Sequence, residues 1–70
     1  MVEKVVELIG TSANSIQDAV ELALSRASVT LSSIREVEIT RTSAVVENGQ
    51  VKGWRVHCKI SFEIESRVHE

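Results

Sequence analysis

The chain has 70 residues, a formal net charge of −2 and a single cysteine. That length allows one domain with a marginal core, and because one cysteine excludes an intrachain disulfide, we expect oligomerisation to supply the missing stability. Interspersed charges and only two aromatic residues, Trp54 and Phe62, also exclude the basic and aromatic surfaces of nucleic-acid-binding proteins.

The N-terminal segment is expected to form a strand. Residues 2–10, VEKVVELIG, are rich in β-branched side chains and end at Gly10, which is typical of a strand of about eight residues. Charges interrupt its apolar positions, so we expect neither a signal peptide nor a membrane span. A cytoplasmic protein without a membrane partner is the resulting expectation.

Residues 11–33 follow a helical period. Their apolar side chains recur at intervals of three and four, which places them on one face of an α-helix of about 17 residues. Ser12 or Asn14 is expected to cap its start. Because the apolar face is mostly alanine, the helix can approach a sheet closely, and a sheet is its expected partner. This alanine stripe consists of Ile16, Ala19, Val20, Ala23, Leu24, Ala27 and Leu31.

The period changes to two from Ile34 onward. Residues 34–46 and 50–65 alternate apolar and polar side chains on either side of Asn48-Gly49, the dipeptide most typical of a type I′ hairpin turn. Such a turn pairs each residue before Asn48 with the residue that lies equally far after Gly49. Apolar side chains then meet apolar ones and acids meet bases. The predicted pairs are Val37 with Ile60, Ile39 with Cys58, Glu38 with Lys59, Thr40 with His57, Thr42 with Arg55 and Ser43 with Trp54.

The expected fold is α+β with the element order β-α-β-β, in a single domain spanning residues 1–70. A three-stranded antiparallel sheet curves around one helix, and residues 66–70 are expected to form a loose tail. Strands of about 13 residues reach roughly 40 Å, whereas a helix of about 17 residues reaches only about 25 Å. The hairpin end of the sheet is therefore left without cover, and we expect other copies of the chain to bury it.

We make a specific prediction for each of three side chains on the two hairpin strands. Trp54 is expected to pack at a subunit interface. Arg41 interrupts the apolar side of its strand, so we predict an acidic partner from a neighbouring copy. Cys58 lies on the apolar side, where its thiol should behave as a small hydrophobe with a raised pKa. The sequence offers no nucleophile and base pair, zinc-ligand spacing or phosphate loop, and we expect no enzymatic activity.

Three motifs mark the ends of the predicted elements: ELIGTS closes the first strand, SRASVTL ends the helix and KISFEIE finishes the last strand. With the β-α-β-β order, they resemble the dodecins, small proteins that assemble as twelve-subunit hollow shells and typically bind flavins. The similarity extends over residues 5–65. The resemblance implies a hollow homododecamer in which the helices lie outside and the curved sheets line the interior.

The resemblance also implies a flavin site on the second and third strands. In flavin-binding dodecins, a tryptophan early in the second strand stacks on the isoalloxazine ring and a glutamine in the third strand hydrogen-bonds the ring edge. The corresponding positions here hold Glu36, within REVEI, and Arg55, as in a subgroup that lacks the stacking tryptophan. We expect a storage shell that sequesters riboflavin, FMN or a related ring, with altered contacts at these two positions.

A shell that binds ions or an anionic small ligand instead of flavin is the alternative. Some family members without the tryptophan resemble calcium-binding shells, and carboxylates repeated around a symmetry axis offer the oxygen ligands that calcium prefers. Ions or an anionic ligand would be held against Glu36, Arg55 and Lys59, although Glu38 with Lys59 is also an ordinary cross-strand ion pair. The candidate residues all project from the face opposite the helix: Glu36, Glu38, Arg55, His57 and Lys59.

Overall fold

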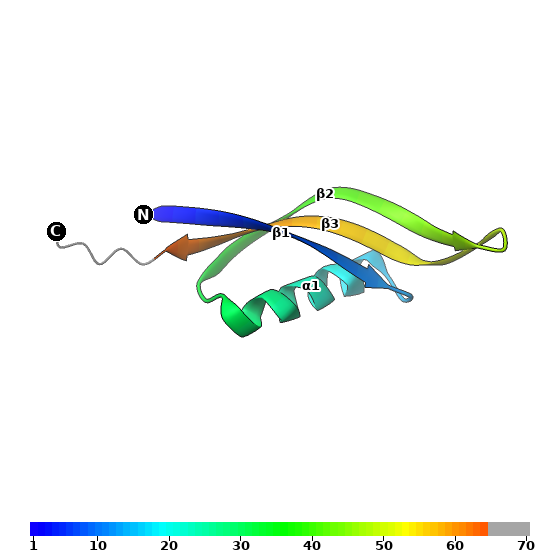
Figure 1. Ribbon diagram of the computed structural model, residues 1–70, viewed down its shortest axis with the longest axis horizontal. Coiled ribbons are helices and arrows are strands. Elements are labelled where there is room, and N and C mark those ends of the chain that lie inside the picture. Colours follow the sequence, from blue (N-terminus) through cyan, green and yellow to red (C-terminus); the bar gives the residue numbers. More distant parts are fainter. Residues whose placement is uncertain (65–70) are drawn as a thin grey trace.

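The structure, a computed structural model, describes residues 1–64 and shows a three-stranded antiparallel sheet with one helix against one face (Figure 1). Its elements are β1 (Val2–Ser12), α1 (Ile16–Thr30), β2 (Ile34–Glu47) and β3 (Gln50–Ile64). The expected β-α-β-β order is confirmed. Among these residues, no helix has the length and apolar character needed to cross a membrane. The tail predicted at residues 66–70 lies outside the described residues.

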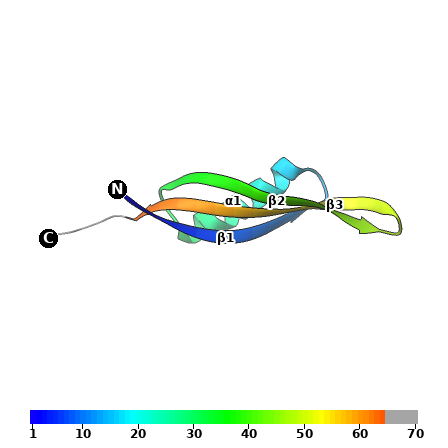
Figure 2. The ribbon, with the colours of Figure 1, turned by 90° about the horizontal axis from the view of Figure 1, so that it is seen from above.

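The central strand of the sheet is β3. Both β1 and β2 pair with it in antiparallel fashion, and Figure 2 shows it running between the other two. The turn that joins β2 to β3 has the predicted geometry, because Asn48 and Gly49 have φ angles of 52° and 74° and a type I′ turn requires two positive values.

Serine side chains fix the start of α1. The N-cap is Ser15, not the predicted Ser12 or Asn14, and its hydroxyl accepts a hydrogen bond from the Asp18 N–H at 2.9 Å. The buried Ser12 hydroxyl instead donates to the Asp18 carboxylate at 2.6 Å and accepts from the Asn14 N–H at 2.9 Å. The last residue of β1 is therefore hydrogen-bonded to the first turn of the helix, which fixes the path of the chain between them.

The core lies between α1 and the central strand. Three alanines of the predicted stripe are buried against apolar side chains of β3, so the helix packs on the sheet as expected. Gly10 permits this close approach, since a Cβ atom at that position would overlap the carbonyl oxygen of Ala19. The buried apolar side chains are Ala19, Ala23, Ala27, Val56, Cys58 and Ile60.

One helix leaves much of the sheet uncovered. At about 3.3 Å per residue the 15 residues of β3 reach roughly 50 Å, against about 22 Å for the 15 residues of α1, and the hairpin extends well past the helix in Figure 1. The predicted mismatch of lengths is confirmed. In addition, α1 packs on β1 and β3 and hardly touches β2. Ile39, Val46 and Val51 are consequently 48%, 60% and 56% exposed.

Candidate functional site

The sheet face that points away from α1, here called the open face, carries the candidate residues. Side chains alternate along a strand, and residues paired across strands share a face. Because Val56, Cys58 and Ile60 are buried under α1, the side chains between them belong to the open face. It includes Glu3, Val5, Glu7, Ile9 and Thr11 of β1, Glu36, Glu38, Arg41 and Ser43 of β2, and Arg55, His57, Lys59, Ser61 and Glu63 of β3.

The five residues predicted to share this face do share it. Glu38 lies opposite Lys59 in the register, as expected, and Glu7 of β1 lies on the other side of the same lysine. Lys59 therefore has a carboxylate-bearing neighbour on each flanking strand. Among residues 1–64, however, the only ion pair at bonding distance joins Arg35 to Glu63, at 2.8 Å.

The register of β2 contains a bulge that was not predicted. Pairing follows the prediction over residues 37–39, but Arg41, and not Thr40, lies opposite His57. Thr40 is the extra residue, and its hydroxyl donates to the His57 carbonyl at 3.3 Å. A second shift between residues 45 and 46 restores the predicted pairing beside the turn.

The bulge corrects the predicted position of Arg41. It reverses the alternation of side chains, so Arg41 lies exposed on the open face and not on the apolar side of the strand. The reason for expecting an acidic partner from another copy is therefore removed. The observed pairs in this segment are Arg41 with His57, Thr42 with Val56, Ser43 with Arg55 and Ala44 with Trp54.

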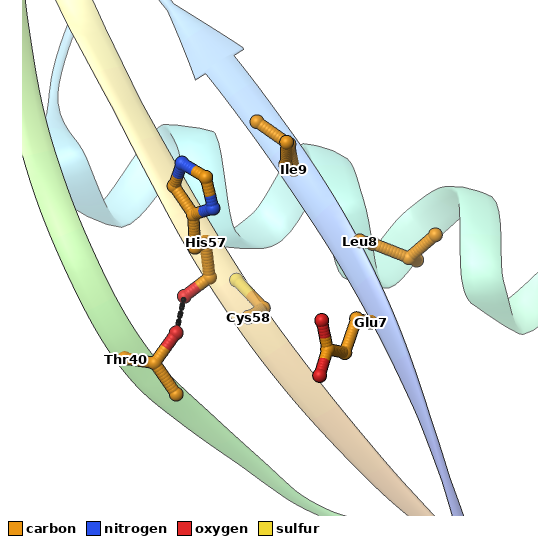
Figure 3. Close-up of a pocket in the computed structure, with 6 residues that line it drawn as sticks. All are labelled: Glu7, Leu8, Ile9, Thr40, His57 and Cys58. Carbon is orange, nitrogen blue, oxygen red and sulfur yellow. Dashed lines mark hydrogen bonds between the residues drawn. The ribbon is translucent and has the colours of Figure 1, made fainter.

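A shallow pocket of about 360 Å³ opens beside His57 (Figure 3). The Glu7 carboxylate and the His57 imidazole bring polar atoms to it, and Ile9 adds an apolar edge. Glu7 and Ile9 were not among the predicted candidates, although the alternation of β1 already places their side chains on the other face of the strand from Val6 and Leu8. The lining residues are Glu7, Leu8, Ile9, Thr40, His57 and Cys58.

The Cys58 thiol is a core group, as predicted. Its side chain is 1% exposed and lies opposite Leu8 and Ile39. Burial raises the pKa of the Cys58 thiol, because the thiolate would lose its hydration. The reactive thiolate form is therefore disfavoured.

Neither aromatic side chain lies on the open face. The chain has one tryptophan, one phenylalanine and no tyrosine. Trp54 is opposite Ser12, and Phe62 is opposite Lys4, which puts both rings on the side of the sheet that bears α1. Within residues 1–64, no tryptophan or phenylalanine ring is therefore placed to stack on a ligand bound at the open face.

Acidic and basic side chains lie toward opposite ends of the open face. Carboxylates gather where β1 begins and β3 ends, whereas Arg41, His57 and Arg55 lie toward the hairpin. Within the described part of the chain, no three side chains of metal-binding type come together. The arrangement thus offers oxygen ligands at one end of the face and cationic hydrogen-bond donors at the other.

Comparisons with known proteins agree on one family. The family model for Dodecin matches residues 2–65. A dodecin from Thermus thermophilus is 33% identical over 64 residues, which cover 91% of this chain and 93% of the relative.

Solved structures give the same result. A dodecin from Streptomyces coelicolor superposes with a TM-score of 0.87 at 37% identity, covering 93% of both chains. An antigen from Mycobacterium tuberculosis described as a calcium-chelating calcium dodecin, with a novel calcium-binding site, superposes with a TM-score of 0.81 at 26% identity over 100% of both chains.

Proposed function

This chain belongs to the dodecin family, and we propose that twelve copies form a hollow, non-catalytic storage shell with the open face inside. The observation that supports assembly is the apolar surface that α1 leaves exposed on β2 and the hairpin. A small chain with such a surface gains stability when sister copies cover it. Trp54, half-buried at the hairpin end, remains our predicted interface residue.

Flavin is the first ligand that we propose for the shell, as riboflavin, FMN or a related ring. Dodecins bind flavins, and the two positions that correspond to flavin contacts, Glu36 and Arg55, lie exposed on the open face. The Arg55 guanidinium offers donors to the carbonyl groups of the ring edge. Because stacking on an aromatic ring is worth about 1–3 kcal/mol in nucleic-acid sites, its loss here should weaken binding roughly tenfold to a hundredfold.

Fluorescence quenching of riboflavin and FMN tests this ligand. We expect quenching at micromolar protein, and stronger quenching, by roughly tenfold in affinity, when Glu36→Trp restores a ring on the open face. Glu47→Trp, the same change at the exposed end of β2, is the matched control and should bind like the wild type. If neither the wild type nor Glu36→Trp quenches flavin, flavin is not the ligand. Light scattering that shows a folded monomer at high dilution would refute the shell itself.

A calcium-binding shell is the second candidate. Glu36 and Glu38 place two exposed carboxylates on the open face of one strand, and the calcium dodecin of Mycobacterium tuberculosis shares this fold over the whole chain. Calcium takes six to eight oxygen ligands, more than two carboxylates provide. The proposed site therefore combines these side chains from several copies around a symmetry axis.

Thermal unfolding separates the calcium candidate from the flavin candidate. Calcium at a hundred times its dissociation constant should stabilise the protein by about 2.7 kcal/mol, and a chelator should remove that gain. Glu36→Gln is expected to abolish the effect, whereas Glu21→Gln, an exposed change on α1, should preserve it. A melting temperature that neither calcium nor chelator changes would argue against this candidate.

A further inference from the structure

Two arginines and one histidine form a basic cluster, Arg41, Arg55 and His57, on the open face. Arg41 of β2 lies directly opposite His57 of β3. Arg55 precedes His57 by two residues in β3, and its side chain lies on the same face. Directly opposed Cβ atoms in a sheet are about 5 Å apart and diagonal ones about 7–8 Å. Arginine side chains are long enough to bring both guanidinium groups to one small ligand above His57.

No carboxylate of the described residues pairs with this cluster. The one ion pair within residues 1–64 joins Arg35 and Glu63, at the far end of the sheet. The nearest acids on the open face, Glu7 and Glu38, flank Lys59 in the adjoining row. Like charges at neighbouring sheet positions repel, so an anion bound between the two arginines would relieve that repulsion.

The bulge at Thr40 creates the cluster. In an unbroken register Arg41 would lie opposite Val56, on the side of the sheet that bears α1. The second shift restores the pairing before the turn, so the pairing differs from that of an unbroken register only over residues 41–45. Bulges often redirect a side chain beside a functional site, and the hydrogen bond from Thr40 to the His57 carbonyl, 3.3 Å long, holds this one in place.

Hydroxyl groups lie beside the cluster. Thr11 of β1 and Ser43 of β2 occupy the two positions opposite Arg55. Guanidinium groups bind phosphate oxygens through paired, charge-assisted hydrogen bonds, and hydroxyl groups add neutral donors. Arg41 and Arg55 are both exposed, so these donors are open to a ligand arriving from solvent.

We propose that the basic cluster binds a phosphate group, either as inorganic phosphate or as the phosphate monoester of a small molecule. The proposal rests on the proposed storage function only in placing the open face inside a shell, because the whole cluster lies within one chain. It specifies the anionic ligand as a phosphate and locates it on Arg41, Arg55 and His57.

Calorimetric titration with inorganic phosphate and with ribose 5-phosphate, at low ionic strength, tests the site. Arg41→Gln and Arg55→Gln are each expected to weaken binding about 10- to 100-fold, since each removes a charge-assisted contact. Arg26→Gln is the matched control, because it makes the same change at an exposed position of α1. Equal affinity for the two probes supports a site for the phosphate group alone, and tighter binding of ribose 5-phosphate supports a monoester site.

Two outcomes would overturn the proposal: neither probe binds the wild-type protein, or all three glutamine variants bind phosphate equally well. If one arginine variant fails to fold, comparing the other variant with the Arg26→Gln control is sufficient to test the site. Light scattering on the same samples keeps this inference separate from the shell. An intact shell that binds no phosphate refutes the cluster, whereas a smaller particle that binds phosphate supports the cluster and refutes the shell.

His57→Ala tests the part played by His57 at constant pH. The variant lacks one hydrogen-bond donor of the cluster, so it should bind inorganic phosphate several-fold more weakly than the wild type. Equal affinity of the variant and the wild type overturns the assignment of His57.

Discussion

Replacing Gly10 with alanine is expected to lower the free energy of unfolding by about 3 kcal/mol or more. The added Cβ atom would overlap the carbonyl oxygen of Ala19 and lie 3.3 Å from the Cβ atom of Ala23. Since the oxygen belongs to the helix backbone, it cannot rotate away as the end of a side chain does. The whole of α1 would have to move off β1, which separates the alanine stripe from the central strand. Urea unfolding at equal protein concentration measures the loss.

Gly49→Ala is the matched control for this substitution. It adds the same methyl group at the hairpin turn, where nothing lies within 4 Å of the new Cβ atom. The positive φ of 74° at Gly49 makes alanine unfavourable there by about 1–2 kcal/mol. The loss at Gly10 should exceed that figure clearly. Equal losses at the two glycines would mean that α1 and β1 do not approach as closely as the structure shows.

Most of the fold follows from the periodicity of the apolar residues. The alanine stripe predicts the helix, and alternation predicts the hairpin strands with Asn48-Gly49 between them. The register is right over residues 37–39, because a slip of one residue there would turn Val37 away from the core. It is right again beside the turn, because a two-residue turn fixes the first pairs of a hairpin.

The bulge was missed because residues 40–43, Thr-Arg-Thr-Ser, contain no apolar side chain to assign a face. Arg41 at an apolar position was the available sign of it. A charged side chain at an apolar position can be accommodated by an acidic partner from another copy, or by a register shift that moves the side chain to the other face. Burying an ion pair costs several kcal/mol per ion. The bulge keeps Arg41 in solvent without that cost, and it turns a predicted interface residue into part of the basic cluster.

The sequence predicted the residues that β2 and β3 contribute to the open face, but not those that β1 contributes. Sequence alternation correctly grouped the candidates of β2 and β3, which a single turn connects. The pairing of β1 with β3 depends on the whole tertiary structure, so Glu7 and Ile9 went unnoticed beside Lys59 and His57. The same pairing extends β1 to Ser12, so Ser12 belongs to the strand and is not the helix cap.

Ile60→Ala is expected to lower the free energy of unfolding by about 2–5 kcal/mol. The side chain is 0% exposed and lies on the central strand between Val6 of β1 and Val37 of β2. The cost depends on how far the surroundings collapse into the cavity. The alanines of α1 have no side-chain rotamers with which to fill it, so the upper half of the range is expected in chemical unfolding experiments.

Ile39→Ala removes the same atoms on the same side of the sheet, but its side chain is 48% exposed in the single chain. From its exposure in the single chain, Ile39→Ala would cost less than half as much as Ile60→Ala, because less apolar area returns to water. In the proposed shell other copies cover this side of β2, so the loss at Ile39 is expected to approach the loss at Ile60. A loss at Ile60 below about 1 kcal/mol would contradict the core described above, and a loss at Ile39 below half of the loss at Ile60 would contradict the burial of β2 by other copies.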